Sequence, residues 1–218
     1  SSDLSLYKWG VSGQVSRKFF NERLLASLGA RSDANSYSPE MSNLFKQLSP
    51  RLSLSYVIAK KWSWNFNTGR YYQMPPYTSL GYRNAAGLLV NKNNGITYIS
   101  GDHIVTGIEY LPTEESKFSV EGFFKYYQKY PFSVTDSIAL ASRGADFNTY
   151  GDEAITSTGT GRAYGTEFAY QNRNLWGTFI TVSYTLVRSE FQDKNGNYIP
   201  SAWDFKNLFY FTARREFK

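Results

Sequence analysis

The chain has 218 residues, of which 18% are aromatic and none is cysteine, and its formal net charge is +6. Without cysteine it can form neither a disulfide framework nor a thiolate metal site. The 24 Lys and Arg residues are scattered among strand and turn positions and form no patch, which argues against a nucleic-acid partner.

The distribution of aromatic and β-branched residues predicts an all-β chain, because helix formers dominate no window. Runs of such residues bounded by turn signals predict nine strands, at 5–20, 23–35, 50–59, 62–74, 102–111, 117–129, 161–172, 175–188 and 204–217. The longest apolar runs, such as 85–90, are too short for a membrane helix. A membrane strand needs only about 10 residues of alternating pattern, so these runs do not exclude a membrane location.

The connections between the predicted strands alternate in length. Short ones are expected at 21–23, 59–61, 112–116 and 172–174, and long ones at 36–49, 75–101, 130–160 and 189–203. In an antiparallel up-and-down meander, every second connection lies at the same end of the sheet. This asymmetry is typical of outer-membrane barrels, which have short turns on one side and long loops on the other.

The strands also alternate between apolar and polar positions. In the predicted strand 50–59 the even positions are Leu52, Leu54, Tyr56 and Ile58, and the odd positions between them are Ser53, Ser55 and Val57. The same split recurs in 62–68, 104–110 and 164–171. One face is therefore apolar and the other is polar and small, which fits either a sheet on a soluble core or a membrane barrel with a wet interior.

The aromatic residues gather near both ends of the predicted strands. Trp and Tyr suit the two membrane interfaces because each has an apolar ring and a polar tip. The predicted membrane-interface aromatics are Tyr56, Trp62, Trp64, Tyr71, Tyr72, Tyr110, Tyr126, Tyr170 and Trp176. The alternative is that aromatic residues simply favour strands.

Six segments in this order resemble the β-barrel portion of TonB-dependent receptors of the bacterial outer membrane, in particular the Bacteroidetes-like type. The segments are LSPRLSLSY, NTGRYYQMPPY, GDHIVTGIEYLP, VEGFFKYYQKYP, GRAYGTEFAYQ and VSYTLVRSEF. The similarity extends from about Leu6 to Phe217. It implies a transmembrane β-barrel localised in the outer membrane, with lipid around it.

The resemblance also implies a 22-stranded barrel blocked by an N-terminal plug, and a TonB-box segment that the inner-membrane TonB complex pulls. Here no plug-like region precedes residue 1, no TonB box is visible, and the ending RREFK differs from the usual final aromatic. We therefore expect residues 1–218 to be one partial barrel of about nine strands. The parent receptor would take up a scarce ligand, such as an iron chelate, cobalamin, a glycan or a peptide, with a surface lipoprotein as a possible partner.

The residues provide little support for catalysis. His103 is the single histidine, no carboxylate stands at a metal-ligand spacing from it, and no G-x-S-x-G sequence is present. Glu121 and Glu167 fall on separate predicted strands and are expected to line the interior. We therefore expect no enzyme activity, no metal site and no cofactor.

Ligand recognition in the parent is expected in the long loops, where aromatic and charged residues are available. The candidates are Tyr77, Tyr82, Arg83, Asn84, Arg143, Asp146, Phe147, Trp203 and Asp204. Two other functions remain open from the sequence: a soluble extracellular β module that binds carbohydrate, and a small closed barrel acting as a passive porin.

Overall fold

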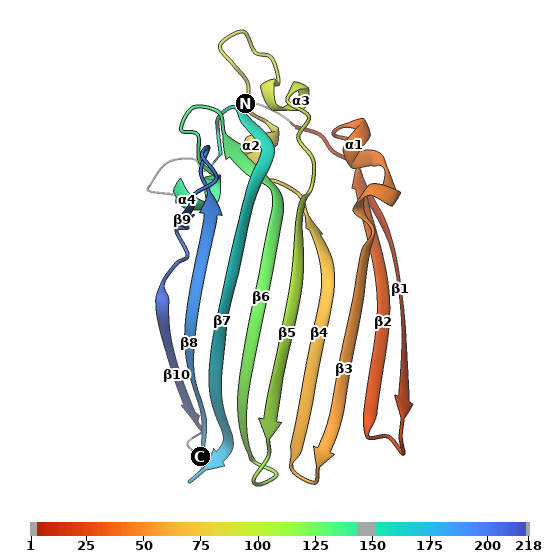
Figure 1. The fold of residues 1–218 in the computed structure, drawn as a ribbon, viewed down its shortest axis with the longest axis vertical. Helices are drawn as coiled ribbons and strands as arrows, with labels where there is room; N and C mark the ends of the chain where they lie inside the picture. Colours follow the sequence, from red (N-terminus) through yellow and green to blue (C-terminus); the bar gives the residue numbers. More distant parts are fainter. Residues whose placement is uncertain (1–3, 144–150, 217–218) are drawn as a thin grey trace.

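The computed structural model describes residues 4–143 and 151–216, and these contain a single antiparallel sheet of ten strands (Figure 1). The strands pair in the order β1-β2-β3-β4-β5-β6-β7-β8-β10, and β9 pairs with β8. Their bounds are β1 Lys8–Phe19, β2 Leu24–Asn35, β3 Ser49–Ala59, β4 Trp62–Gln73, β5 Ile99–Tyr110, β6 Ser116–Ser133, β7 Ile155–Leu175, β8 Thr178–Gln192, β9 Tyr198–Pro200 and β10 Lys206–Arg215. This order confirms the predicted all-β up-and-down meander.

Short helices occupy the long connections, all at one end of the sheet (Figure 1). They are α1 Pro39–Ser42, the 3-10 helix η1 Leu44–Gln47, α2 Tyr77–Leu80, α3 Val90–Asn93 and α4 Leu140–Arg143. Local sequence explains the first: Ser38 accepts a hydrogen bond from the backbone of Met41, and Pro39 begins the helix with its fixed φ. None of the helices in residues 4–143 and 151–216 has the length and apolarity needed to cross a membrane.

All nine predicted strands are present, and β9 is an additional one. The end of β8 was predicted at 188 but lies at Gln192, and β6 and β7 also extend further than predicted, to Ser133 instead of 129 and from Ile155 instead of 161. Their pairing shifts register on either side of Tyr130, and Lys129 has a φ of 56°. A bulge of this kind interrupts the period-two pattern, and the sequence therefore conceals the continuation of both strands.

The prediction that residues 172–174 form the fourth short turn is wrong. Strand β7 continues to Leu175, and the turn consists of Trp176 and Gly177, with φ values of 52° and 76°. Two consecutive residues with positive φ form the tight hairpin turn whose twist matches that of the strands. The pairing shifts register between Asn172 and Leu175, which allows β7 to pass through the polar sequence NRN without ending.

The register extends the two predicted faces across the whole sheet, because directly paired residues lie on the same face. One row crosses β2 to β8 through Ala26, Leu54, Phe66, Thr106, Gly122, Thr166 and Leu186. The next row on the opposite face runs through Ser55, Asn65, Gly107, Glu121, Glu167 and Thr185. The sheet thus has an apolar face and a polar face along its full width.

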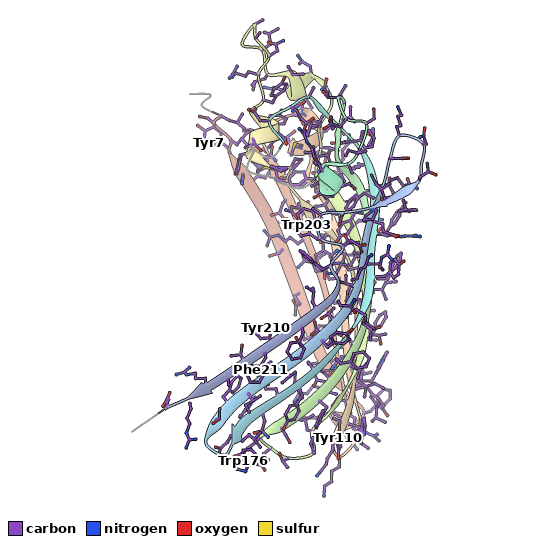
Figure 2. The ribbon with its side chains drawn as sticks, turned by 90° about the vertical axis from the view of Figure 1, so that its left-hand side faces the viewer. Tyr7, Tyr110, Trp176, Trp203, Tyr210 and Phe211 are labelled. Atoms are coloured by element: carbon purple, nitrogen blue, oxygen red, sulfur yellow. The ribbon has the colours of Figure 1, made fainter. Side chains whose placement is uncertain are left out.

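The sheet is a single curved layer rather than one half of a sandwich. Figure 2 shows the strands bending around a hollow side, toward which Trp203 lies. We call this the concave face and the opposite one the convex face. One hollow is lined by residues of β4 and β10 together with odd-numbered residues of β5 to β8. Strands so far apart can share a hollow only on the inside of the curve, and the odd-numbered positions of β5 to β8 belong to the polar face. The polar face is therefore the concave one.

The buried core lies among the long loops, outside the layer of strands. Its members are fully or nearly fully buried and come from three long connections and the first residue of β7: Tyr37, Met41, Leu80, Ile96, Tyr98, Leu140 and Ile155. By contrast, large apolar residues on the convex face are exposed, including Leu28 at 60%, Ile104 at 49% and Phe168 at 46%. A soluble domain of this size would bury such a face in a core. The sheet, which we call the wall, therefore requires an apolar environment on its convex side.

Buried amides join the loops to one another. The side chain of Asn91, fully buried, donates hydrogen bonds to the carbonyls of Ser79 (2.6 Å) and Glu153 (2.8 Å) and accepts one from the backbone of Ile155 (2.9 Å). The amide of Asn35 donates to the Tyr98 hydroxyl at 2.9 Å. These bonds connect three long loops into one packed unit, which we call the loop core.

Candidate functional site

A hollow of about 620 Å³ lies on the concave face and forms the candidate functional site. Its lining combines aromatic rings with charged and polar groups, including Phe123, Tyr127, Phe191, Trp203, Lys125 and Glu167. These side chains come from β6, β7, β8 and the segment before β10, which the curvature of the sheet brings together. A concave, largely apolar surface with a few convergent polar groups is the usual form of a ligand site.

Aromatic residues and glycines alternate in one row of the concave face. From β4 to β8 this row reads Tyr71, Gly101, Tyr127, Gly161 and Phe191, each directly paired with the next. The rings lie over the glycines and toward one another: the centroids of Tyr127 and Phe191 are 5.7 Å apart. Each large ring therefore has space because its neighbour in the row carries no side chain.

The glycines leave space that a side chain would otherwise take from the neighbouring rings. A Cβ at Gly161 would lie 2.3 Å from the Phe191 ring, and one at Gly101 would lie 3.3 Å from the Tyr127 ring. Two rows further along the same face, a Cβ at Gly165 would lie 2.8 Å from the Phe123 ring, and closer still to the backbone of Leu186. Rings that cover strand glycines are a recognised way of stabilising such positions. Here they also create an aromatic floor for the hollow.

Polar and cationic groups border this floor. Arg51 places its guanidinium 4.5 Å from the centroid of Tyr71, whose ring stacks on His103 at 4.5 Å. Glu121 and Glu167 are directly paired, as expected for two carboxylates lining the interior, and Glu167 accepts a hydrogen bond from the Thr185 hydroxyl at 3.0 Å. No group of three or more metal-binding side chains occurs within the described ranges. The arrangement suits the binding of a flat or ring-shaped molecule.

Of the predicted ligand residues that fall within 4–143 and 151–216, Trp203 alone lines this hollow. Asp204 lies beside it, but its Oδ1 accepts hydrogen bonds from the Ser189 backbone (2.8 Å) and the Arg188 guanidinium (3.2 Å). Its side chain is 3% exposed. Asp204 therefore fixes the segment that carries Trp203 and does not face the hollow.

The structure uses most of the other loop candidates to build the loops. Asn84 accepts backbone hydrogen bonds from Ala86 and Leu88, and the Arg83 guanidinium donates to the Gly87 carbonyl at 2.7 Å. Tyr82 accepts a backbone bond from Val90, Tyr77 lies under the Lys8 ammonium, and Arg143 pairs with Asp136 at 3.2 Å and with Glu153. Asp146 and Phe147 lie outside the described residues.

The sequence-based list omitted the strand residues of the hollow, notably Phe123, Lys125 and Phe191. The odd positions of these strands, on the polar face, are expected to be small or hydrated, and an occasional aromatic ring there gives no separate signal in the sequence. The one available indication is the spacing of Gly101, Gly161 and Gly165, which marks positions where a neighbouring ring needs room.

On the convex face, aromatic rings form a continuous row beside the short turns. Trp62, Tyr110, Phe118 and Tyr170 are paired in sequence across β4 to β7, with centroid distances of 4.4, 6.4 and 4.6 Å. Trp64 and Tyr56 form the adjacent row, and the indole of Trp64 donates to the Thr106 hydroxyl at 2.9 Å. Trp176 is 85% exposed at the tip of the last turn.

At the loop end of the convex face lie Tyr126, in a row with Arg70, Asp102 and Arg162, and Tyr72, in the next row with Ser100 and Gln128. Tyr71 is a correction to the sequence-based set. Period two places it on the concave face, where it stacks on His103, so it belongs to the aromatic floor and not to a membrane interface. The error arose because neighbouring tyrosines of a strand point to opposite faces.

The sequence matches the family described as "TonB dependent receptor-like, beta-barrel" over residues 1–214. The chain belongs to this family. Barrels of TonB-dependent receptors lie in the bacterial outer membrane, and the family comprises receptors and transporters rather than enzymes. Among curated proteins, none matches this sequence.

Solved structures of TonB-dependent receptors share the fold. They include the pyoverdine receptor FpvA from Pseudomonas aeruginosa PAO1 (TM-score 0.65, 13% identity, 98% of this chain and 29% of that one). They also include the alcaligin receptor FauA from Bordetella pertussis (0.56, 16%, 94% and 33%) and the FrpB iron transporter from Neisseria meningitidis (0.57, 13%, 86% and 26%). The chain thus spans about a third or less of these receptors.

Proposed function

We propose that residues 1–218 form one continuous segment of the wall of an outer-membrane receptor that takes up a scarce ligand, with an iron chelate as the first candidate. The aromatic floor and Trp203 support this most directly, because rings beside the charged groups of Lys125, Glu121 and Glu167 can contact the flat and polar parts of such a chelate. Among the structurally similar proteins are a pyoverdine receptor, an alcaligin receptor and an iron transporter. Cobalamin, glycans and peptides remain the other ligand classes.

In the proposed transport cycle, the loops and the hollow capture the ligand, and energy comes from the TonB complex acting on another segment of the receptor. No chemistry is performed on the ligand. The convex aromatic rows are proposed as girdles at the two membrane interfaces, with lipid contacting the apolar band between them. A surface lipoprotein is a further proposed partner.

The exposed convex face separates this proposal from the soluble carbohydrate-binding module. If Ile104, Ile108 and Phe168 face lipid, the complete protein that carries this chain will aggregate without detergent and become monodisperse in a mild detergent, as measured by light scattering. A compact monomer in plain buffer would mean that these residues are buried in a core, and the soluble module would then be the better interpretation.

Ligand binding is tested by tryptophan fluorescence of the same protein, with ferric pyoverdine, ferric alcaligin, cobalamin and a maltodextrin as probes. Binding in the hollow should quench Trp203, and the variant Trp203→Phe should lose that quenching. It should also bind about tenfold more weakly, equivalent to about 1.4 kcal/mol. Trp176→Phe is the matched control, since Trp176 lies at the opposite end of the wall. Equal quenching in both variants would contradict a ligand site in the hollow.

A further inference from the structure

An exposed apolar pair stands beside the wall at its loop end. Phe45 in η1 is 91% exposed and Leu48, just after η1, is 52% exposed. Monomeric proteins do expose single apolar residues, but a phenylalanine with almost no protein contact beside a second apolar side chain requires an explanation. Neither residue belongs to the concave hollow.

The segment carrying these residues is held in place. Asn43 caps η1 by accepting a hydrogen bond from the Phe45 backbone at 3.0 Å, and the Gln47 amide donates to the Glu40 carbonyl at 3.1 Å. Gln47 itself is 2% exposed. The exposure of Phe45 therefore results from an ordered backbone that points its ring away from the protein.

The segment lies on the convex side of the sheet. The Ser32 hydroxyl donates a hydrogen bond to the Leu44 carbonyl, so η1 rests over the face of β2 to which Ser32 points. By period two this is the face of Leu28 and Ala30, whose register continues into the apolar rows of β3 and β4. Figure 1 shows this part of the chain beside the upper ends of β2 and β3.

The height of the segment matches the thickness of the apolar band. Ten residues separate Leu48 from Ile58, which stands in the aromatic end of β3. At about 3.3 Å per residue they span about 33 Å, and a strand tilt of about 40° reduces this to about 25 Å along the membrane normal. An outer-membrane barrel has an apolar band of about 25 Å. Phe45 and Leu48 thus lie at the outer edge of the lipid layer when the turn-end aromatics lie at the inner edge.

We propose that Phe45 and Leu48 insert into the acyl chains of the outer leaflet and anchor the loop core at the lipid surface. The proposal rests on the proposed lipid-facing role of the convex face, and it adds a contact made by a loop segment rather than by a strand. Interfacial segments bind membranes in this way, with an apolar side in the lipid and a polar side above it. Lys46, paired with Glu40 at 2.5 Å, provides the polar side.

Residues 1–218 contain no cysteine, so a cysteine introduced in this segment takes one nitroxide spin label once any cysteine elsewhere in the complete protein has been replaced. Labels at Phe45→Cys and Leu48→Cys in the complete protein, reconstituted in phosphatidylcholine and phosphatidylglycerol vesicles, are compared with two controls. Ile104→Cys lies midway along the convex face. Leu88→Cys is a matched exposed leucine, 61% exposed, in the loop that projects beyond the strand ends (Figure 1). Power saturation then compares collisions with oxygen, which enters lipid, and with a polar nickel chelate, which does not.

The proposal predicts that the nickel chelate reaches the labels at Phe45 and Leu48 about tenfold less often than the label at Leu88, while oxygen reaches them freely. If Ile104 is in lipid but Phe45 and Leu48 behave like Leu88, the insertion is refuted and the wall placement survives. If Ile104 itself is open to the nickel chelate, the placement of the wall fails and the insertion with it. If neither reagent reaches Phe45 and Leu48, protein covers them, which also overturns the proposal.

Discussion

The alternation of rings and glycines on the concave face makes a quantitative prediction at Gly161. In Gly161→Ala the new Cβ would lie 2.3 Å from the Phe191 ring, which is 3% exposed and confined by Tyr127 and Tyr130. Because the ring cannot move away freely, overpacking should lower the free energy of unfolding by about 1–3 kcal/mol. Gly122→Ala is the matched control: a Cβ there meets nothing within 4 Å, so the change should stay within about 0.5 kcal/mol.

A double-mutant cycle identifies the cause of the loss. Phe191→Ala alone should cost about 3–5 kcal/mol, because it leaves a cavity in the aromatic floor. In that background Gly161→Ala should be nearly neutral, since the ring that it would strike is gone, and the coupling energy should therefore be about 1–3 kcal/mol. The assay is guanidinium unfolding of the complete protein in phospholipid vesicles, followed by tryptophan fluorescence. Equal losses from Gly161→Ala with and without the ring would refute steric conflict as the reason for the glycine.

Three further predictions concern the wall and the loop core. Ile104→Arg, midway along the convex face, should cost about 2–4 kcal/mol in the same unfolding assay, whereas Asn67→Arg at the same level of the concave face should cost much less; equal costs would contradict the assignment of faces. Asn91→Ala should cost about 1–3 kcal/mol, because two buried carbonyls and one N–H lose their partner; hydrogen exchange should rise in the loops and not in the strands. Burial raises the pKa of Tyr37 to about 12 from its ordinary 10.0, so the unfolded chain loses the phenolic proton first. The contribution of Tyr37 to the free energy of unfolding is therefore fully present below pH 10 and is lost as the pH rises toward 12. A Tyr37→Phe variant whose free energy of unfolding falls just as steeply over this range would show that Tyr37 does not cause the loss.

The strands could be predicted because each strand carries its own pattern. The alternation in 50–59 and 62–68 needs no distant residue to be recognised, and the short connections follow from turn residues. The errors occur where the backbone departs from regular strand geometry, so that the alternation of residues no longer indicates the structure. The register shift around Tyr130 hides the ends of β6 and β7, and the positive φ of Trp176 moves a turn to a residue that sequence rules place in a strand.

The site was less predictable than the wall. Trp203 was found because an aromatic residue in a long loop is conspicuous, whereas Phe191 and Phe123 acquire their role from the curvature of the sheet and from glycines on neighbouring strands. Asn84 and Arg83 have side chains that could bind a ligand, but these side chains make hydrogen bonds to backbone groups of their own loop. Local composition cannot distinguish these two uses, because the difference depends on which backbone groups lie nearby.

The loop core has a consequence for the order in which the chain assembles. Each pair β1–β2, β3–β4, β5–β6 and β7–β8 is closed by a short turn, so these hairpins need little loop-closure entropy and can form locally. Met41, Leu80 and Leu140, in contrast, come from three different connections and meet only after the hairpins between them are aligned. We expect the wall to grow by addition of hairpins and the loop core to form last. The rate at which a wall segment unfolds should therefore become low only after its loops have packed.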